Sequence, residues 1–285
     1  ESELAQMIYP PPILKQFRAG EIELNYATCG TGPDLVLLHG GTSGWGMWYA
    51  LIPELAKHFT VFALDLPWSG GSTKPSALDH ERYVIDPVSQ FVTTICRRAP
   101  IIVGHSFGGW VALKLVLRGI EIKRLVLIDS MGFSRHAPLL FRFSTLRPFT
   151  RLLTKTALRP TREIMDNFLT SVFYDRSLQI PDLVLNYFFE ALSCGRFFHP
   201  LEFIATLYSG GRLKEKFDLR EQCQRIDLPV GIIWGKHDSV AVLHYEQAGF
   251  ALLPRYTLRL CENSGHVPPL EEPEKCLQYI LELTS

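Results

Sequence analysis

A serine stands among three glycines in the stretch VGHSFGGW, residues 103–110. Ser106 follows an apolar run, so a buried strand is expected to end before it and a helix to begin after it. A sharp strand-to-helix turn strains its central residue and exposes that hydroxyl, and Gly104 and Gly108 leave room for strand and helix to approach. The spacing predicts a nucleophilic serine. A phosphate-binding turn is the alternative, which the absence of G-x-G-x-x-G and of a GK[ST] ending disfavours.

A serine hydroxyl is a weak nucleophile at neutral pH, so it needs a base, and the base needs a carboxylate that orients it. Among nine histidines, His266 is the strongest candidate, because it lies in a Gly/Pro-rich loop after the apolar run YTLRLC. Asp238 has the equivalent place after VGIIWG. Both loops would lie at the carboxyl ends of strands, where α/β sheets bind their ligands. Asp129, which follows RLVLI, is the alternative carboxylate.

An attacked carbonyl group becomes an oxyanion, which needs preorganised N–H donors. The glycine-rich loop HGGTSGWGMW, residues 39–48, follows a predicted strand. We expect the backbone amides of Gly41 and Phe107 to donate to the oxyanion, and His39 to brace the loop. The residues expected to contact substrate are Gly40, Trp45, Trp48 and Val267.

Short apolar runs alternate with amphipathic segments along most of the chain. Strands are predicted around 21–29 and at 34–40, 60–65, 99–105, 123–129, 228–235 and 255–261, and helices near 46–57, 81–98, 107–118, 243–252 and 274–283. Continuous runs of Val, Ile and Leu are typical of strands that are buried on both faces of a parallel sheet. The alternation predicts an α/β fold with a doubly wound, mostly parallel sheet.

The stretch from Met131 to Leu228 interrupts this alternation, with no convincing β-run and several helical segments rich in Phe, Leu and Arg. Since sheet-type segments flank it, we interpret residues 131–228 as a helical cap inserted into a core of residues 1–130 and 229–285. Its aromatic side chains indicate either packing within the cap or an apolar substrate group. They include Phe141, Phe143, Phe149, Tyr187, Phe188 and Phe189.

Within this cap, residues 135–162 carry seven basic residues and no acidic one. Arg147, Arg151, Lys155 and Arg159 recur at every fourth position, which places them on one face of a helix. Two interpretations stay open. The face is either simply solvated, or it binds an anionic partner, namely a membrane surface or an acidic substrate carrier.

The composition excludes several classes of protein. Lys plus Arg number 29 and Asp plus Glu number 29, so no net charge favours nucleic-acid binding. No apolar segment has the length of a membrane span. Six scattered cysteines without a Cys-x-x-Cys pair match neither a metal site nor a disulfide framework, so we expect reduced thiols and a cytoplasmic protein. We also expect no metal and no cofactor. The sequence predicts no particular oligomeric state.

Together, these motifs resemble those of α/β-hydrolase-fold enzymes over nearly the whole chain. The matching pieces are GTGPDLVLLHGG, FALDLPWSGGST, VGHSFGGW, LVLIDS, WGKHD and SGHVPPLEEPE. The resemblance implies Ser106 as nucleophile, Asp238 as acid and His266 as base. Two loops depart from the family pattern. Trp68 replaces the first glycine of Asp-x-x-Gly-x-Gly-x-Ser, and the proline common after the acid is absent from DSVAVL.

The resemblance further implies a serine esterase that cleaves a carboxylic ester with an apolar acyl or alcohol group. Dehalogenases and epoxide hydrolases of this fold use aspartate at the nucleophile position, so Ser106 excludes them. Carbon–carbon bond hydrolases commonly have tryptophan where Val267 stands, and proline-releasing peptidases read His-Gly-Gly-Pro-Gly instead of HGGTSG. A carbon–carbon bond hydrolase, a cofactor-free perhydrolase and a hydrolase-like receptor with little turnover stay open as alternatives.

Overall fold

The computed structural model describes residues 11–41, 43–77, 79–137, 161–193, 206–209 and 211–285. At its centre lies an eight-stranded sheet with the order β1-β2-β4-β3-β5-β6-β9-β10. Its strands are β1 (Ile13–Ala19), β2 (Ile22–Cys29), β3 (Asp34–Leu38), β4 (Thr60–Leu64), β5 (Ile101–His105), β6 (Arg124–Ile128), β9 (Val230–Gly235) and β10 (Tyr256–Cys261). The pairs β1–β2 and β2–β4 are antiparallel, and the other pairs are parallel. The predicted doubly wound, mostly parallel sheet is confirmed.

The central strands owe their composition to burial on both faces. Every residue of β5 and β9 is buried, as are all but the first residue of β3, β4 and β6. Strand β1 was not predicted, because it lies at the edge of the sheet, is mostly exposed and mixes polar with apolar residues. It reaches β2 through a tight turn in which Gly20 has a φ of +60°, a conformation that glycine adopts without strain.

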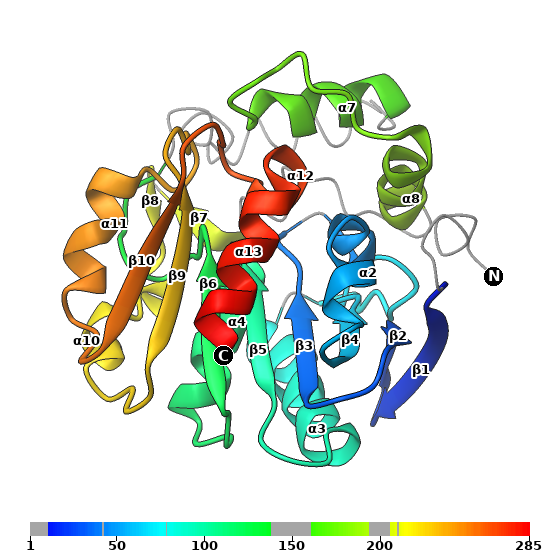
Figure 1. The fold of residues 1–285 in the computed structure, drawn as a ribbon, viewed down its shortest axis with the longest axis horizontal. Coiled ribbons are helices and arrows are strands. Elements are labelled where there is room, and N and C mark those ends of the chain that lie inside the picture. The colour runs from blue at the N-terminus through cyan, green and yellow to red at the C-terminus, as the bar shows by residue number, and fades with distance from the viewer. Residues whose placement is uncertain (1–10, 42, 78, 138–160, 194–205, 210) are drawn as a thin grey trace.

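Helices cover both faces of the sheet. Figure 1 shows α2 (Ile52–Leu55) and α13 (Pro273–Thr284) in front of the sheet, and α3 (Asp86–Ile95) and α4 (Phe107–Leu117) behind it. The short helix α10 (Arg220–Cys223) contacts α4 and also α11 (Leu243–Phe250). Each face has its own hydrophobic cluster, one around Trp110 of α4 and the other around Ile280 of α13. The sheet is therefore the middle layer of three.

Two helices of the interval between β6 and β9 lie over the carboxyl ends of the strands. They are α7 (Arg162–Ser171) and α8 (Asp182–Ser193), at the top of Figure 1. A hairpin of β7 (Tyr208–Ser209) and β8 (Arg212–Leu213) corrects the expectation that this interval holds no strand, since two-residue strands leave no periodic pattern. Farther along, Phe217 packs on Trp110 of α4, with ring centroids 5.1 Å apart. The division into core and cap stays a prediction.

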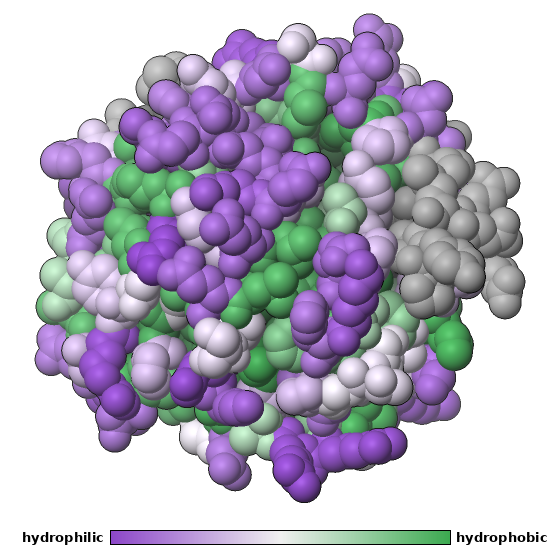
Figure 2. Space-filling view, viewed as in Figure 1, coloured by the Kyte–Doolittle hydropathy of each residue, from purple (hydrophilic) through white to green (hydrophobic). Residues whose placement is uncertain are grey.

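The described surface is mixed in character. On the face viewed in Figure 2, hydrophobic residues appear in separate areas between hydrophilic ones. None of the described helices is long and apolar enough to cross a membrane. The described cysteines are free thiols, and burial raises the pKa of Cys29 to about 11 and of Cys96 to about 12, which keeps both protonated and unreactive.

Candidate active site

Ser106 lies on a strained turn between β5 and α4. Its φ of 50° and ψ of −113° fall outside the regions that residues with a side chain normally occupy. A Cβ atom on Gly104 would lie 2.5 Å from the carbonyl oxygen of Gly108, and one on Gly108 would lie 2.2 Å from that of Leu38. The glycines therefore allow α4 to pack directly against β3 and β5, and the packed turn holds Ser106 in its strained conformation.

His266 and Asp238 meet Ser106 in one hydrogen-bonded chain. Nδ1 of His266 lies 2.8 Å from Oδ2 of Asp238, and Nε2 lies 3.1 Å from Oγ of Ser106. Asp238 is held in turn, because its Oδ1 accepts the backbone N–H groups of Val240 at 2.7 Å and Ala241 at 2.9 Å. The imidazole thus donates from Nδ1 to the carboxylate, and Nε2 is free to accept the serine proton.

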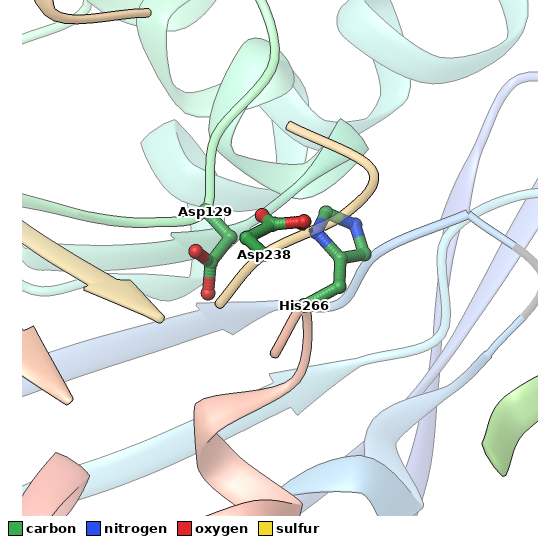
Figure 3. Close-up of side chains that lie close together, drawn as sticks. All are labelled: Asp129, Asp238 and His266. Carbon is green, nitrogen blue, oxygen red and sulfur yellow. Dashed lines mark hydrogen bonds and ion pairs between the residues drawn. The ribbon is translucent and has the colours of Figure 1, made fainter. Parts of the chain in front are cut away.

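Asp129, the alternative carboxylate, lies beside this chain without contacting the imidazole. Figure 3 shows Asp238 between Asp129 and His266. Oδ1 of Asp129 accepts the N–H of Gly235 at 2.9 Å, and its backbone has a φ of 43°. Burial, followed by the charge of Asp238, raises the pKa of Asp129 well above its ordinary value, which favours the neutral form of its carboxyl. The polar atoms of these three side chains lie within 4.8 Å of one another.

Two buried histidines support the site. His39 donates from Nδ1 to the carbonyl of Gly40 at 2.6 Å and accepts the N–H of Leu66 at Nε2 at 2.8 Å, so it braces the loop as expected. His105 was missed in the sequence. Its Nε2 donates to the carbonyl of His266 at 2.7 Å, and burial lowers the pKa of His105 to about 3, which keeps it neutral. Its position directly before Ser106 in the sequence could have indicated that it lies at the site.

An apolar pocket of about 870 Å³, including its part open to solvent, lies beside Ser106. It is lined by Gly40, Gly41, Ser43, Met47, His105, Ser106, Phe107, Met131, Phe168, Leu169, Val172, Phe188, Leu207, Tyr208, Val240, Ala241, His266, Val267 and Leu270. The expected oxyanion donors Gly41 and Phe107 are both present in this lining. Phe107 is the first residue of α4 and directly follows Ser106.

Trp45 and Trp48 correct the expected set of substrate contacts. Gly40 and Val267 line the pocket, but both tryptophans are 0% exposed and belong to the hydrophobic core. They form the ends of a short 3₁₀ helix, Trp45–Trp48, whose indoles pack inward, and Met47 between them reaches the pocket instead.

Among the aromatic residues of the predicted cap, some line the pocket and others do not. Phe188 lines the pocket, whereas the hydroxyl of Tyr187 donates to Oδ1 of Asp65 at 2.5 Å. Phe141, Phe143 and Phe149 lie outside the described residues, as do Arg151, Lys155 and Arg159 of the basic segment.

The sequence of the chain is similar to those of known proteins over most of its length. A sequence model of the alpha/beta hydrolase family matches residues 35–278. The chain is 30% identical over 259 residues to the pimeloyl-[acyl-carrier protein] methyl ester esterase of Nitrosomonas europaea, covering 88% of this chain and 96% of that protein. It is 25% identical over 260 residues to a monoacylglycerol lipase of Mus musculus, covering 89% and 76%.

Solved structures share the fold. The carboxylesterase CesB of Bacillus subtilis superposes with a TM-score of 0.76 at 18% identity, over 95% of this chain and 91% of that one. Epoxide hydrolase CorEH superposes with a TM-score of 0.78 at 23% identity, over 95% and 98%. Because the family model matches most of the sequence, the chain belongs to the alpha/beta hydrolase family.

Proposed function

We propose that this protein is a serine esterase that cleaves carboxylic esters with an uncharged, apolar acyl or alcohol group. One observation carries the proposal, namely the chain of hydrogen bonds from Asp238 through His266 to Ser106 beside an apolar pocket. The pimeloyl ester esterase among the relatives supports an ester-bond hydrolase. No cofactor is required for this reaction, because side chains supply the nucleophile, base and acid.

In the first step, Oγ of Ser106 attacks the ester carbonyl carbon while its proton passes to Nε2 of His266. The carbonyl oxygen becomes an oxyanion that accepts hydrogen bonds from the amides of Gly41 and Phe107. The bond from the carbonyl carbon to the alkoxy oxygen then breaks, and the leaving alcohol takes the proton from Nε2. The products of this step are the free alcohol and an ester of the acyl group with Ser106.

In the second step, a water molecule attacks the acyl group on Ser106, and His266 takes the proton of that water. The second oxyanion collapses with release of the carboxylic acid, and Oγ of Ser106 recovers its proton from Nε2. Asp238 keeps Nδ1 as a donor throughout and stabilises each imidazolium that forms. A single base therefore serves both steps.

The pocket favours an uncharged substrate group. Its lining includes no Lys, Arg, Asp or Glu among the described residues. A carboxylate without a partner in such surroundings loses its hydration, which costs several kcal/mol by analogy with other buried charges. We expect kcat/KM for p-nitrophenyl hexanoate to be about 10²-fold higher than for p-nitrophenyl hydrogen adipate. The adipate ester has the same chain length but ends in a carboxylate. Equal values for the two esters would exclude the uncharged-group proposal.

Labelling with a serine-directed fluorophosphonate tests the nucleophile. We expect stoichiometric labelling of the wild type and none of Ser106→Ala, together with loss of ester turnover. Ser239→Ala is the matched control, since Ser239 is exposed and lies next to Asp238. Labelling that survives in Ser106→Ala would assign the nucleophile elsewhere. Steady release of p-nitrophenol separates an esterase from a receptor of this fold, which would give a single burst or none.

The basic segment is proposed as a site for an anionic partner, either a membrane surface or an acidic substrate carrier. The support is the sequence alone, in which Arg151, Lys155 and Arg159 share a helical face. Their joint replacement by glutamate should abolish binding to anionic vesicles at low salt while hydrolysis of a small neutral ester is retained. Wild-type protein that ignores the vesicles would exclude the membrane, and loss of small-ester activity would assign these residues to the fold.

A further inference from the structure

Glu271 stands out among the carboxylates that the mechanism does not use. It ends the short helix α12 (Pro268–Glu271), five residues after His266. Its Oε1 accepts the backbone N–H of Val267 at 2.9 Å, and its Oε2 accepts that of Gly265 at 2.8 Å. The carboxylate therefore holds the backbone on both sides of His266.

The same carboxylate also reaches the interval predicted as the cap. Oε2 of Glu271 accepts the N–H of Tyr174 at 2.7 Å, two residues from Val172, whose carbonyl accepts the N–H of His266 at 3.0 Å. The three successive N–H groups from Gly265 to Val267 are thus all bound by partners from outside the tripeptide. A rotation of the backbone from Gly265 to Val267 would break at least one of these hydrogen bonds.

Close packing reinforces the contact. A Cβ atom on Gly265 would lie 2.5 Å from the carbonyl oxygen of Val172 and 2.7 Å from the nitrogen of Tyr174, so the two segments touch backbone to backbone. The ring of Tyr174 stacks on that of His237, the neighbour of Asp238, with centroids 3.9 Å apart and planes inclined by 11°. The segment 172–174 therefore contacts both the base loop and the acid loop.

We propose that Glu271 is a positioning residue for His266, and that it couples the placement of the imidazole to the segment 172–174. The inference rests on the proposed function, in which His266 is the base. The imidazole must keep Nε2 near Oγ of Ser106 and Nδ1 near Asp238, so a small displacement of its backbone weakens two contacts at once. Misplacement of a reacting group by about 1 Å can cost about 10²-fold in rate.

The test compares Glu271→Ala with Glu271→Gln and with a control at the adjacent glutamate. Glu272 is a matched control, because its Oε2 accepts the N–H of Asn263 at 2.8 Å, in the same loop but away from His266. Rates are divided by the concentration of sites titrated with fluorophosphonate, so unfolded protein does not count. We expect Glu271→Ala to lose about 10–10²-fold in kcat per site with little change in KM, since the lost interaction positions a reacting group.

Glu271→Gln keeps one carboxamide oxygen and places an NH₂ group opposite at least one backbone N–H, so its loss should be smaller than that of alanine. If Glu271→Ala does not fold, Glu271→Gln is compared with the wild type in its place. Glu272→Ala should retain a kcat per site close to that of the wild type. If the Glu271 variants keep wild-type kcat per site and merely melt at lower temperature, Glu271 serves stability alone and the inference is overturned.

Hydrogen exchange supplies a readout that needs no catalysis. In Glu271→Ala, exchange should accelerate in peptides spanning residues 172–176 and 263–268, because the amides of Tyr174, Gly265 and Val267 lose their acceptor. Unchanged exchange in both peptides would overturn the coupling. A wild type without ester turnover would instead refute the proposed function, and the exchange measurement would still decide the role of Glu271 in the loop.

Discussion

The substitution Asp238→Asn should remove most of the activity while leaving the fold intact. Oδ1 of Asp238 accepts two backbone N–H groups, those of Val240 and Ala241. An asparagine must therefore place its carbonyl oxygen there, which turns its NH₂ group toward Nδ1 of His266. Nδ1 then has to accept, so the imidazole proton moves to Nε2, the atom that should receive the serine proton.

The expected loss is about 10⁴-fold in kcat, as for the equivalent change in serine proteases. At about 1.36 kcal/mol for each factor of ten, this corresponds to about 5.4 kcal/mol of transition-state stabilisation. The assay is the steady-state hydrolysis of p-nitrophenyl butyrate, with sites counted from the wild-type titration and folding checked by circular dichroism.

Asp129→Asn is the matched control. Burial and the charge of Asp238 raise the pKa of Asp129, which favours the neutral form of its carboxyl. Asparagine has the shape and charge of that neutral form, and its oxygen can still accept the N–H of Gly235, so kcat should stay within about threefold, less than 1 kcal/mol. If Asp129→Asn loses the activity and Asp238→Asn keeps it, the acid has been assigned to the wrong carboxylate. Equal losses would mean that the two carboxyls act as one unit.

Three further changes test the packing around the site. Gly108→Ala should lower the free energy of unfolding by about 1–3 kcal/mol in urea, because its Cβ would lie 2.2 Å from the carbonyl oxygen of Leu38. Tyr187→Phe should lower it by about 1–2 kcal/mol, since the buried carboxylate of Asp65 loses a donor. Glu246→Gln should remove a pH dependence. Burial raises the pKa of Glu246 from 4.5 to about 8, so the folded wild type binds the extra proton and its stability falls as pH rises through this window, by at most about 5 kcal/mol. Relative to the wild type, the free energy of unfolding of Glu246→Gln should increase as the pH rises from 4.5 to about 8.

Each of these has a clear contrary outcome. An unchanged urea midpoint in the alanine variant would mean that α4 can move away from β3. Tyr187→Phe with wild-type stability would mean that water replaces the tyrosine hydroxyl at Asp65. Parallel stability curves for Glu246→Gln and the wild type would mean that Glu246 has an ordinary pKa in the folded protein.

Local pattern was enough to predict most strands of the central sheet along the chain and the turn at Ser106. Continuous apolar runs are long enough to identify buried strands, and the glycine spacing around the serine reflects contacts between neighbouring elements. The expectation that His266 and Asp238 would meet at one edge of the sheet followed from the same reading, because parallel strands end together at their carboxyl ends. The edge strand β1 was not predicted, because it is mostly exposed and has no apolar run.

The position at a strand end did not separate the two carboxylates, and only the family resemblance favoured Asp238. Asp129 and Asp238 both follow buried strands, so both were expected near the histidine. What separates them is the direction of each side chain, which depends on the backbone after the strand. The N–H groups of Val240 and Ala241 hold Asp238 toward His266, whereas the N–H of Gly235 on the neighbouring strand holds Asp129.

The inward packing of Trp45 and Trp48 was also decided by tertiary structure. A glycine-rich loop next to the nucleophile predicted contact with substrate, but large apolar side chains are stabilised most where they leave water completely. The contact of Glu271 with Tyr174 spans 97 residues of sequence. Neither helical nor strand periodicity carries information over that separation, because periodicity reports only which face of an element is buried. The three-dimensional packing of the histidine loop against the segment 172–174 alone determines which backbone groups the glutamate can reach.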